Sequence, residues 1–115
     1  MKIFRISRRL WLDDRRPMPP DFDIWAKTVD EAKAILSKGD VNFISFDNDL
    51  GEDQEGRHLA AWIEENAFHG KIGKMDWQVH SANPIGAQDI SKAMSNADRF
   101  WDNLAQKSVS RNNPE

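Results

Sequence analysis

The 115-residue sequence contains no cysteine, which excludes a disulfide framework and any metal site built from thiolates. Long apolar runs are also missing. Those present are far too short to span a bilayer, and the N-terminus lacks the apolar stretch of a signal peptide. No internal repeat or low-complexity segment is visible. We therefore expect a cytoplasmic protein with no membrane partner.

Positive charge is too scarce for extended binding to a nucleic-acid backbone, because 16 Lys and Arg residues face 19 Asp and Glu residues. The distribution of charge is uneven, however. Basic residues gather in the first sixteen positions, and acid dominates residues 21–65. A basic end beside an acidic centre suits a small phosphorylated ligand held by metal and arginine. The alternative is a solvated surface with chance asymmetry.

Four short apolar segments have the composition of strands, and three of them are followed by segments with helical periodicity. The predicted strands are 10–12, 22–27, 41–46 and 77–79. The predicted helices run from a cap at Thr28 to a stop at Gly39, over about 56–67, and over about 90–104. This alternation predicts a single α/β domain over residues 1–107 with a mainly parallel sheet of four to five strands. Residues 108–115 are expected to form a polar, disordered tail. Whether residues 1–7 add a fifth strand stays open.

Reactive side chains follow three of the predicted strands: Asp13 and Asp14 after the first, Asp47 and Asp49 after the third, and His80 and Ser81 after the fourth. In an open parallel sheet, ligands bind outside the carboxyl ends of the strands. With the strand order 2-1-3-4, the first and third strands are neighbours and their aspartates share one crevice. Crowded carboxylates repel one another unless a cation intervenes, and oxygen-only ligands suit Mg²⁺ or Mn²⁺.

Structural roles compete with ligand binding at several of these positions. Asp13 and Asp14 could cap the turn before the proline-rich loop, although their repetition after the third strand favours metal binding. Glu52 and Asp53 precede the helix that opens at Gly56, so we expect them to complement the dipole of that helix.

The side chains after the fourth strand have the same ambiguity. His80 could donate a proton to a leaving oxygen or steady phosphate charge, or it could be a structural histidine. Ser81 and Asn83 could bind phosphate oxygens or only cap the turn before the last helix. Arg16 could clamp a phosphate through two hydrogen bonds or lie on the surface, whereas Arg15 is expected to face solvent.

Three motifs, LDDRRP (12–17), FDNDLGED (46–53) and VHSANPIG (79–86), together resemble the family of cyclic-phosphate-processing receiver-like domains. The resemblance covers about residues 8–105. It implies a three-layer, receiver-like (flavodoxin-like) fold and an activity on cyclic phosphates in RNA repair or nucleotide signalling.

The resemblance also assigns roles to individual residues. Asp13 and Asp14 match the acidic pair that binds metal in receivers, and Asp47 matches the aspartate that receivers phosphorylate. Ser81 matches a small hydroxyl residue after the fourth strand, while Asp49, His80 and Asn83 match features that separate this family from ordinary receivers. A fifth strand ending in the lysine of receivers is missing from the pattern, which leaves its basic role to Arg16, His80 or Lys74.

Taken together, the sequence predicts a metal-dependent phosphoesterase that acts on the cyclic phosphate of a nucleotide or an RNA end. The expected metal ligands are Asp13, Asp14 and Asp47; the catalytic residues are His80, Asp47 and Asp49; and the phosphate-binding residues are Ser81, Asn83 and Arg16. The cofactor would be Mg²⁺ or Mn²⁺. The alternative is a receiver-like module without turnover that binds a protein partner or sequesters a cyclic nucleotide.

Overall fold

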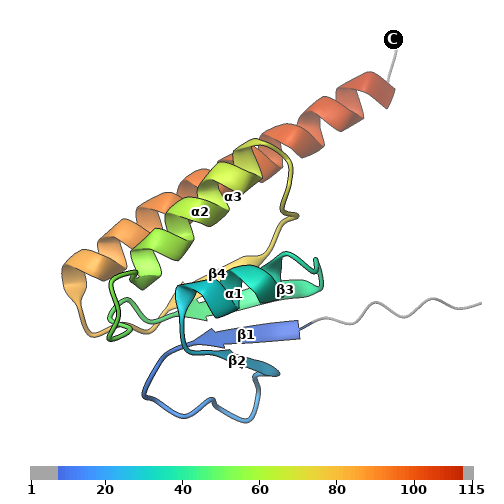
Figure 1. Ribbon diagram of the computed structural model, residues 1–115. Coiled ribbons are helices and arrows are strands. Elements are labelled where there is room, and N and C mark those ends of the chain that lie inside the picture. The colour runs from blue at the N-terminus through green and yellow to red at the C-terminus, as the bar shows by residue number, and fades with distance from the viewer. Residues whose placement is uncertain (1–7, 113–115) are drawn as a thin grey trace, which may run out of the picture.

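The computed structural model describes the backbone of residues 8–112 and the side chains of residues 8–106 (Figure 1). The open question about residues 1–7 lies outside the described residues. The elements along the chain are β1 (Arg8–Leu12), β2 (Ile24–Ala26), α1 (Val29–Leu36), β3 (Val41–Phe46), α2 (Gly56–Phe68), β4 (Asp76–Val79) and α3 (Pro84–Asn112). The predicted alternation of strands and helices is therefore confirmed.

The four strands form one parallel sheet in the order β2-β1-β3-β4, as the sequence predicted. Within the described residues no further strand joins this sheet. Helices α1 and α2 each connect one parallel strand of this sheet to another, as the helices of right-handed crossovers do. The central position of β1 and β3 brings the chain segments that follow them next to each other.

The fold has the predicted three layers. The side chains of Leu10, Leu12, Ile44 and Phe46 point from the sheet into the main core, which all three helices line. The alternate residue Trp11 is buried on the opposite face, outside that core. There the connection 13–23 forms the third layer. It places a phenylalanine, Phe22, edge-on against Trp11 at 5.1 Å and against Phe43 at 5.9 Å between ring centroids.

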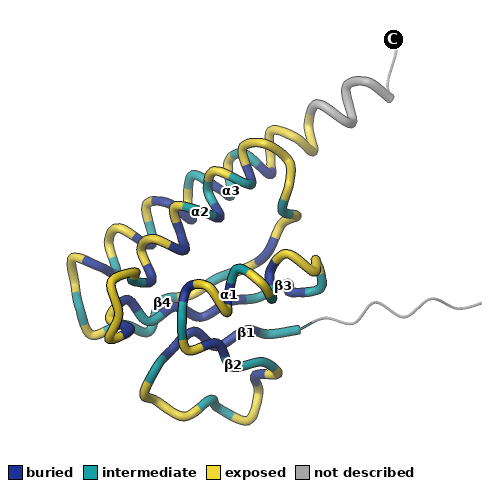
Figure 2. The backbone as a smooth tube through the Cα atoms, in the orientation of Figure 1, coloured by how far each residue is buried: buried dark blue, intermediate teal, exposed yellow. Residues whose placement is uncertain are grey.

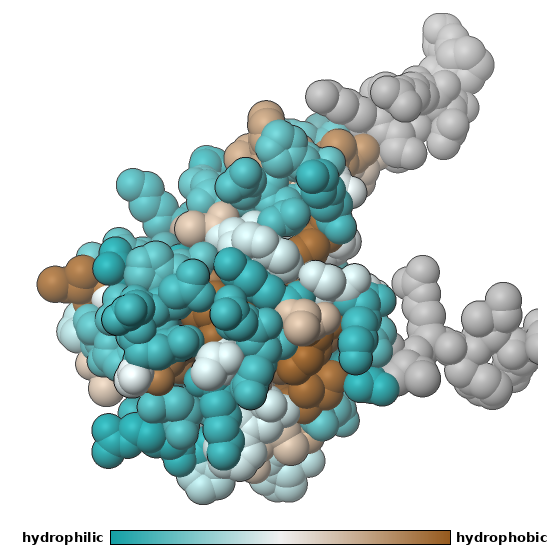
Figure 3. Space-filling view, in the orientation of Figure 1, coloured by the Kyte–Doolittle hydropathy of each residue, from teal (hydrophilic) through white to brown (hydrophobic). Residues whose placement is uncertain are grey.

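Burial follows this arrangement along the chain (Figure 2). The buried positions of α2 lie at helical spacing and face the sheet and α3, because an amphipathic helix buries one stripe of its surface. The visible face of the molecule is mostly hydrophilic, with apolar atoms showing between polar side chains (Figure 3). None of the helices in the described part of the chain is long and apolar enough to cross a bilayer.

Two predictions about chain ends and caps differ from the structure. The side chain of Glu52 accepts the backbone N–H of Val29 at 3.0 Å, so it caps α1 and not the helix that opens at Gly56. Helix α3 continues to Asn112, through most of the segment that the sequence predicted to be a disordered tail. No proline precedes Pro114 in that segment, so nothing in it forces the helix to end earlier.

Candidate functional site

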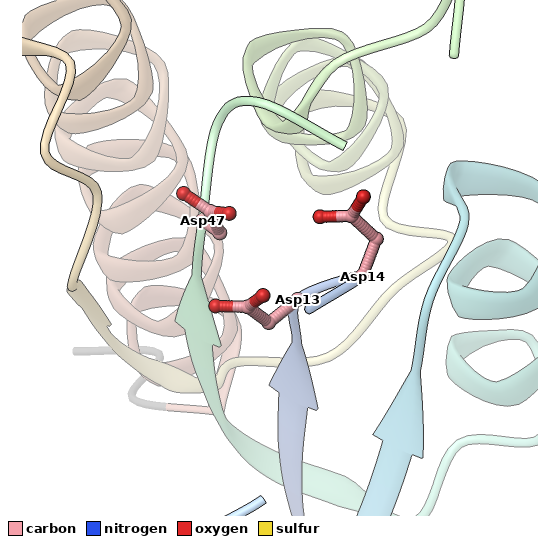
Figure 4. A group of neighbouring side chains, drawn as sticks. All are labelled: Asp13, Asp14 and Asp47. Carbon is pink, nitrogen blue, oxygen red and sulfur yellow. The ribbon is translucent and has the colours of Figure 1, made fainter. Parts of the chain in front are cut away.

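The carboxyl ends of β1 and β3 bring three aspartates together, which we call the aspartate cluster. Asp13 and Asp14 directly follow β1, and Asp47 directly follows β3 (Figure 4). One carboxylate oxygen of each lies within 4.8 Å of the others. The predicted convergence of these side chains in one crevice is therefore confirmed.

Asp13 is the buried member of the cluster. Its Oδ1 accepts the backbone N–H groups of Arg15 and Arg16, each at 2.8 Å, and its Oδ2 lies 2.9 Å from Nε2 of His80. Burial alone would raise the pKa of Asp13, but the hydrogen bonds from Arg15, Arg16 and His80 outweigh it and lower the pKa. Asp13 thus caps the turn after β1, which was the structural role considered for it, and it also contributes an ionised oxygen to the cluster.

Asp47 has only partial compensation for its burial. Burial raises the pKa of Asp47 and the charge of Asp13 raises it further, while His80, the N–H of Asn48 and Arg16 offset this only in part. Oδ1 of Asp14 is buried without a hydrogen-bond partner among the described residues. Such a buried, unpaired carboxylate oxygen is costly unless something positive neutralises it.

The donor set of the cluster fits a hard divalent cation. All the available donor atoms are carboxylate oxygens, and they come from two adjacent loops. Mg²⁺ and Mn²⁺ prefer such ligands and keep waters or phosphate oxygens in their remaining positions. The unpaired oxygen of Asp14 and the raised pKa of Asp47 are both features that a cation would relieve.

Asp49 lies beside the cluster but belongs to a different hydrogen-bond network. Its Oδ1 accepts from Nδ2 of Asn48 at 3.1 Å and from Nδ2 of Asn83 at 3.2 Å. Asn83 also caps α3, because its Oδ1 accepts the N–H of Gly86 at 3.0 Å, and its own N–H is donated to Oγ of Ser81 at 3.1 Å. Ser81 and Asn83 therefore build the turn before α3, and this turn holds Asp49 in place.

Asp13, Asp47 and Asp49 lie in the lining of a cleft of about 550 Å³. Its walls are formed by Asp13, Arg15, Arg16, Pro17, Asp47, Asp49 and Ala82. Arg16 donates from Nη1 to the backbone oxygen of His80 at 2.7 Å, which ties the loop after β1 to the end of β4. The cleft thus combines two arginines with three carboxylates. Lys74 precedes β4 and lies at the amino edge of the sheet, so it cannot supply positive charge to this cleft.

His80 is held by contacts on several sides. Its Nε2 pairs with Asp13, its Nδ1 lies 2.7 Å from Oγ of Ser45, and its ring stacks on Trp11 with a centroid distance of 3.9 Å and an interplanar angle of 3°. Only 14% of its side chain is exposed. Both ring nitrogens are therefore engaged inside the protein, and a proton transfer from His80 to a ligand would require one of these bonds to break.

Sequence reasoning missed two features of the site. Arg15 is exposed, as expected, but it also lines the cleft, and its adjacency to Arg16 in the same loop was the available signal. Ser45 is fully buried against His80. A single hydroxyl between the apolar Ile44 and Phe46 was the corresponding signal in the strand.

The parallel sheet of order 2-1-3-4, with an acidic cluster beyond β1 and β3, defines a receiver-like domain. Comparison with protein families agrees: the family model described as "Cyclic-phosphate processing Receiver domain" matches residues 8–96. The chain belongs to this family. No curated protein matches the chain.

Proposed function

We propose that this receiver domain is a metal-dependent phosphoesterase that opens a cyclic phosphate on a nucleotide or an RNA end, in RNA repair or nucleotide signalling. The observation that carries the proposal is the cleft itself, which two members of the aspartate cluster, Asp13 and Asp47, line together with Arg15 and Arg16. Membership of the family links such a cleft to cyclic phosphates.

Asp13, Asp14 and Asp47 would hold one Mg²⁺ or Mn²⁺ ion. When bound, this ion would supply Lewis-acid polarisation of a phosphoryl oxygen and a lowered pKa for a coordinated water. Arginine recognises phosphate through paired N–H donors, so Arg15 and Arg16, which line the same cleft, would orient the phosphate. Ser81 and Asn83 would support the phosphate from the turn before α3.

Hydrolysis of a cyclic diester breaks one P–O bond, adds water and leaves a phosphomonoester. The attacking water loses a proton and the leaving oxygen gains one. Asp49 is the carboxylate of the cleft that lies outside the aspartate cluster, so it is our candidate for the group that accepts the proton. In a variant route, an oxygen of Asp47 attacks phosphorus, the ester oxygen leaves, and water then hydrolyses the aspartyl phosphate.

A second candidate function is a receiver-like module that binds a cyclic nucleotide or a protein partner without turnover. The engagement of both ring nitrogens of His80 favours it, because this removes the most obvious proton donor from the cleft. The acidic cluster and the arginines would then serve recognition only.

A turnover assay separates the two. The panel would contain 2′,3′-cyclic mononucleotides, RNA ending in a cyclic phosphate, and cyclic di- and trinucleotides, each with Mg²⁺, with Mn²⁺ and with chelator. We expect metal-dependent opening of at least one substrate class, lost in Asp47→Asn and His80→Ala. His69→Ala is the matched control, since His69 is exposed and caps the distal end of α2. If nothing turns over while calorimetry detects metal-dependent binding, the enzyme is excluded and the binding module takes its place.

A further inference from the structure

A continuous chain of hydrogen bonds runs beneath the aspartate cluster, from Gln78 through Ser45 and His80 to Asp13. Nε2 of Gln78 donates to Oγ of Ser45 at 3.0 Å, Oγ of Ser45 lies 2.7 Å from Nδ1 of His80, and Nε2 of His80 lies 2.9 Å from Oδ2 of Asp13. The residues come from three adjacent strands, β4, β3 and β1, and from the ends of two of them.

The two ends of this chain fix its direction. The amide nitrogen of Gln78 can only donate, and the ionised carboxylate of Asp13 can only accept. Ser45 therefore accepts from Gln78 and uses its own hydroxyl proton toward His80, because the buried hydroxyl has no other acceptor in the described structure. In the neutral ring, a proton on Nδ1 instead of Nε2 would leave that hydroxyl proton without a partner, which is costly at a fully buried position.

In its neutral form, His80 therefore carries the ring proton on Nε2 and donates it to Asp13. The stacked ring of Trp11 fixes the plane of the imidazole, and Arg16 holds its backbone oxygen. A histidine held on every side in this way is suited to orienting another group rather than to exchanging protons with a substrate. Ser45 has no exposed surface, so it cannot act as a nucleophile although it completes a Ser–His–Asp sequence.

We propose that Ser45 and His80 are positioning residues for metal binding, with Gln78 in support: they hold the carboxylate of Asp13 in the orientation that the divalent ion requires. The inference rests on the metal site of the proposed function but not on turnover. Partners that orient a metal ligand from outside the coordination sphere typically contribute about 10- to 100-fold to metal affinity.

The first test needs neither metal nor substrate. Nitrogen NMR of the His80 ring in the metal-free protein, recorded at alkaline pH where imidazoles are neutral, should show a protonated Nε2 and an unprotonated Nδ1. In Ser45→Ala this single tautomer should be lost, while Ser95→Ala, the same change at an exposed position of α3, should leave it unchanged. A protonated Nδ1 in the wild-type protein would overturn the proposal.

The second test measures Mn²⁺ affinity by calorimetry. Ser45→Ala and His80→Ala should each bind Mn²⁺ about tenfold more weakly or worse. His80→Gln, which keeps an N–H donor for Asp13, should recover most of that affinity, and Ser95→Ala should match the wild type. Unchanged affinity in both Ser45→Ala and His80→Ala would refute the positioning role.

Gln78 provides a variant that does not disturb the core, because its side chain lies at an exposed position. Gln78→Ala should weaken the preference of His80 for the tautomer protonated on Nε2. It should also weaken Mn²⁺ binding, but less than Ser45→Ala does. A protein that binds Mn²⁺ with this pattern of variants but opens no cyclic phosphate would keep the positioning role and exclude the phosphoesterase. A protein that turns over substrate, and whose variants all bind Mn²⁺ with equal affinity, would keep the phosphoesterase and exclude the positioning role.

Discussion

Replacing Asp47 by asparagine removes one negative charge from the aspartate cluster while keeping the size of the side chain. The pKa of Asp47 is raised in the fold, by burial and by the charge of Asp13. A carboxyl group with a raised pKa favours the folded protein only at low pH, and this contribution is lost as the pH rises through the folded-state pKa. At neutral pH the ionised Asp47 therefore destabilises the metal-free protein, and Asp47→Asn should stabilise it.

The magnitude follows from the geometry of the cluster. Two unit charges at the 4.8 Å limit of the cluster repel by about 3 kcal/mol at an effective dielectric constant of about 20. Solvent screens part of this, because Asp47 is only half-buried, and the variant loses the attraction to His80 and Arg16. We expect the free energy of unfolding of the metal-free variant to rise by about 1 kcal/mol.

Bound metal should make the wild type more stable than Asp47→Asn. An ion that binds only the folded protein at a hundred times its dissociation constant adds about 2.7 kcal/mol to the wild type. Asp47→Asn should gain far less at the same concentration, because it lacks one of the three ligands. Urea unfolding at neutral pH, followed by tryptophan fluorescence in chelator and in rising Mg²⁺, measures both effects.

Asp53→Asn is the matched control, since Asp53 is an exposed acid of the same loop that lies outside the cluster. It should change neither the stability in chelator nor the response to Mg²⁺. A lower stability of Asp47→Asn than of the wild type in chelator would refute the charge repulsion, and equal stabilisation of both proteins by Mg²⁺ would refute the role of Asp47 as a metal ligand.

Three further predictions concern single residues. The pKa of Asp13 is lowered, so its contribution to stability is present above the unfolded-state pKa and lost as pH falls through the folded-state pKa. The destabilisation caused by Asp13→Asn at neutral pH should therefore shrink as urea unfolding is repeated at increasingly acidic pH. A Cβ at Gly86 would lie 2.4 Å from Cγ of Asn48, so Gly86→Ala should lower the free energy of unfolding by about 1 kcal/mol. At an ordinary helix position the same change stabilises the protein, so a gain in stability would contradict this close packing. Glu52→Ala removes the side-chain acceptor for the N–H of Val29 and should cost about 1 kcal/mol in the same assay; no change would show that this cap contributes nothing.

Local patterns in the sequence were sufficient for the elements and for part of the site. Apolar runs of strand length and helical spacing predicted the alternation, and parallel strands that end at one edge placed Asp13, Asp14 and Asp47 together. The family motifs coincide with these strand ends. This works because secondary structure and turn chemistry depend on residues that are close in the sequence.

The roles of other residues depended on contacts that no local pattern encodes. Glu52 caps a helix that begins 23 residues earlier, and Ser45 meets a histidine that lies 35 residues later. Arg16 reaches the backbone of His80 across 64 residues.

The class of fold and the edge of the sheet that gathers acid could be predicted from the sequence, because they follow from periodicity and from where strands end; the strand order 2-1-3-4 was a premise that the structure confirms. The enclosure of His80 between Ser45, Asp13 and Trp11 and the position of Arg15 in the cleft became visible only in the folded protein. The physical reason is that hydrogen bonds and stacking act over a few ångströms, and packing alone brings distant parts of the chain that close.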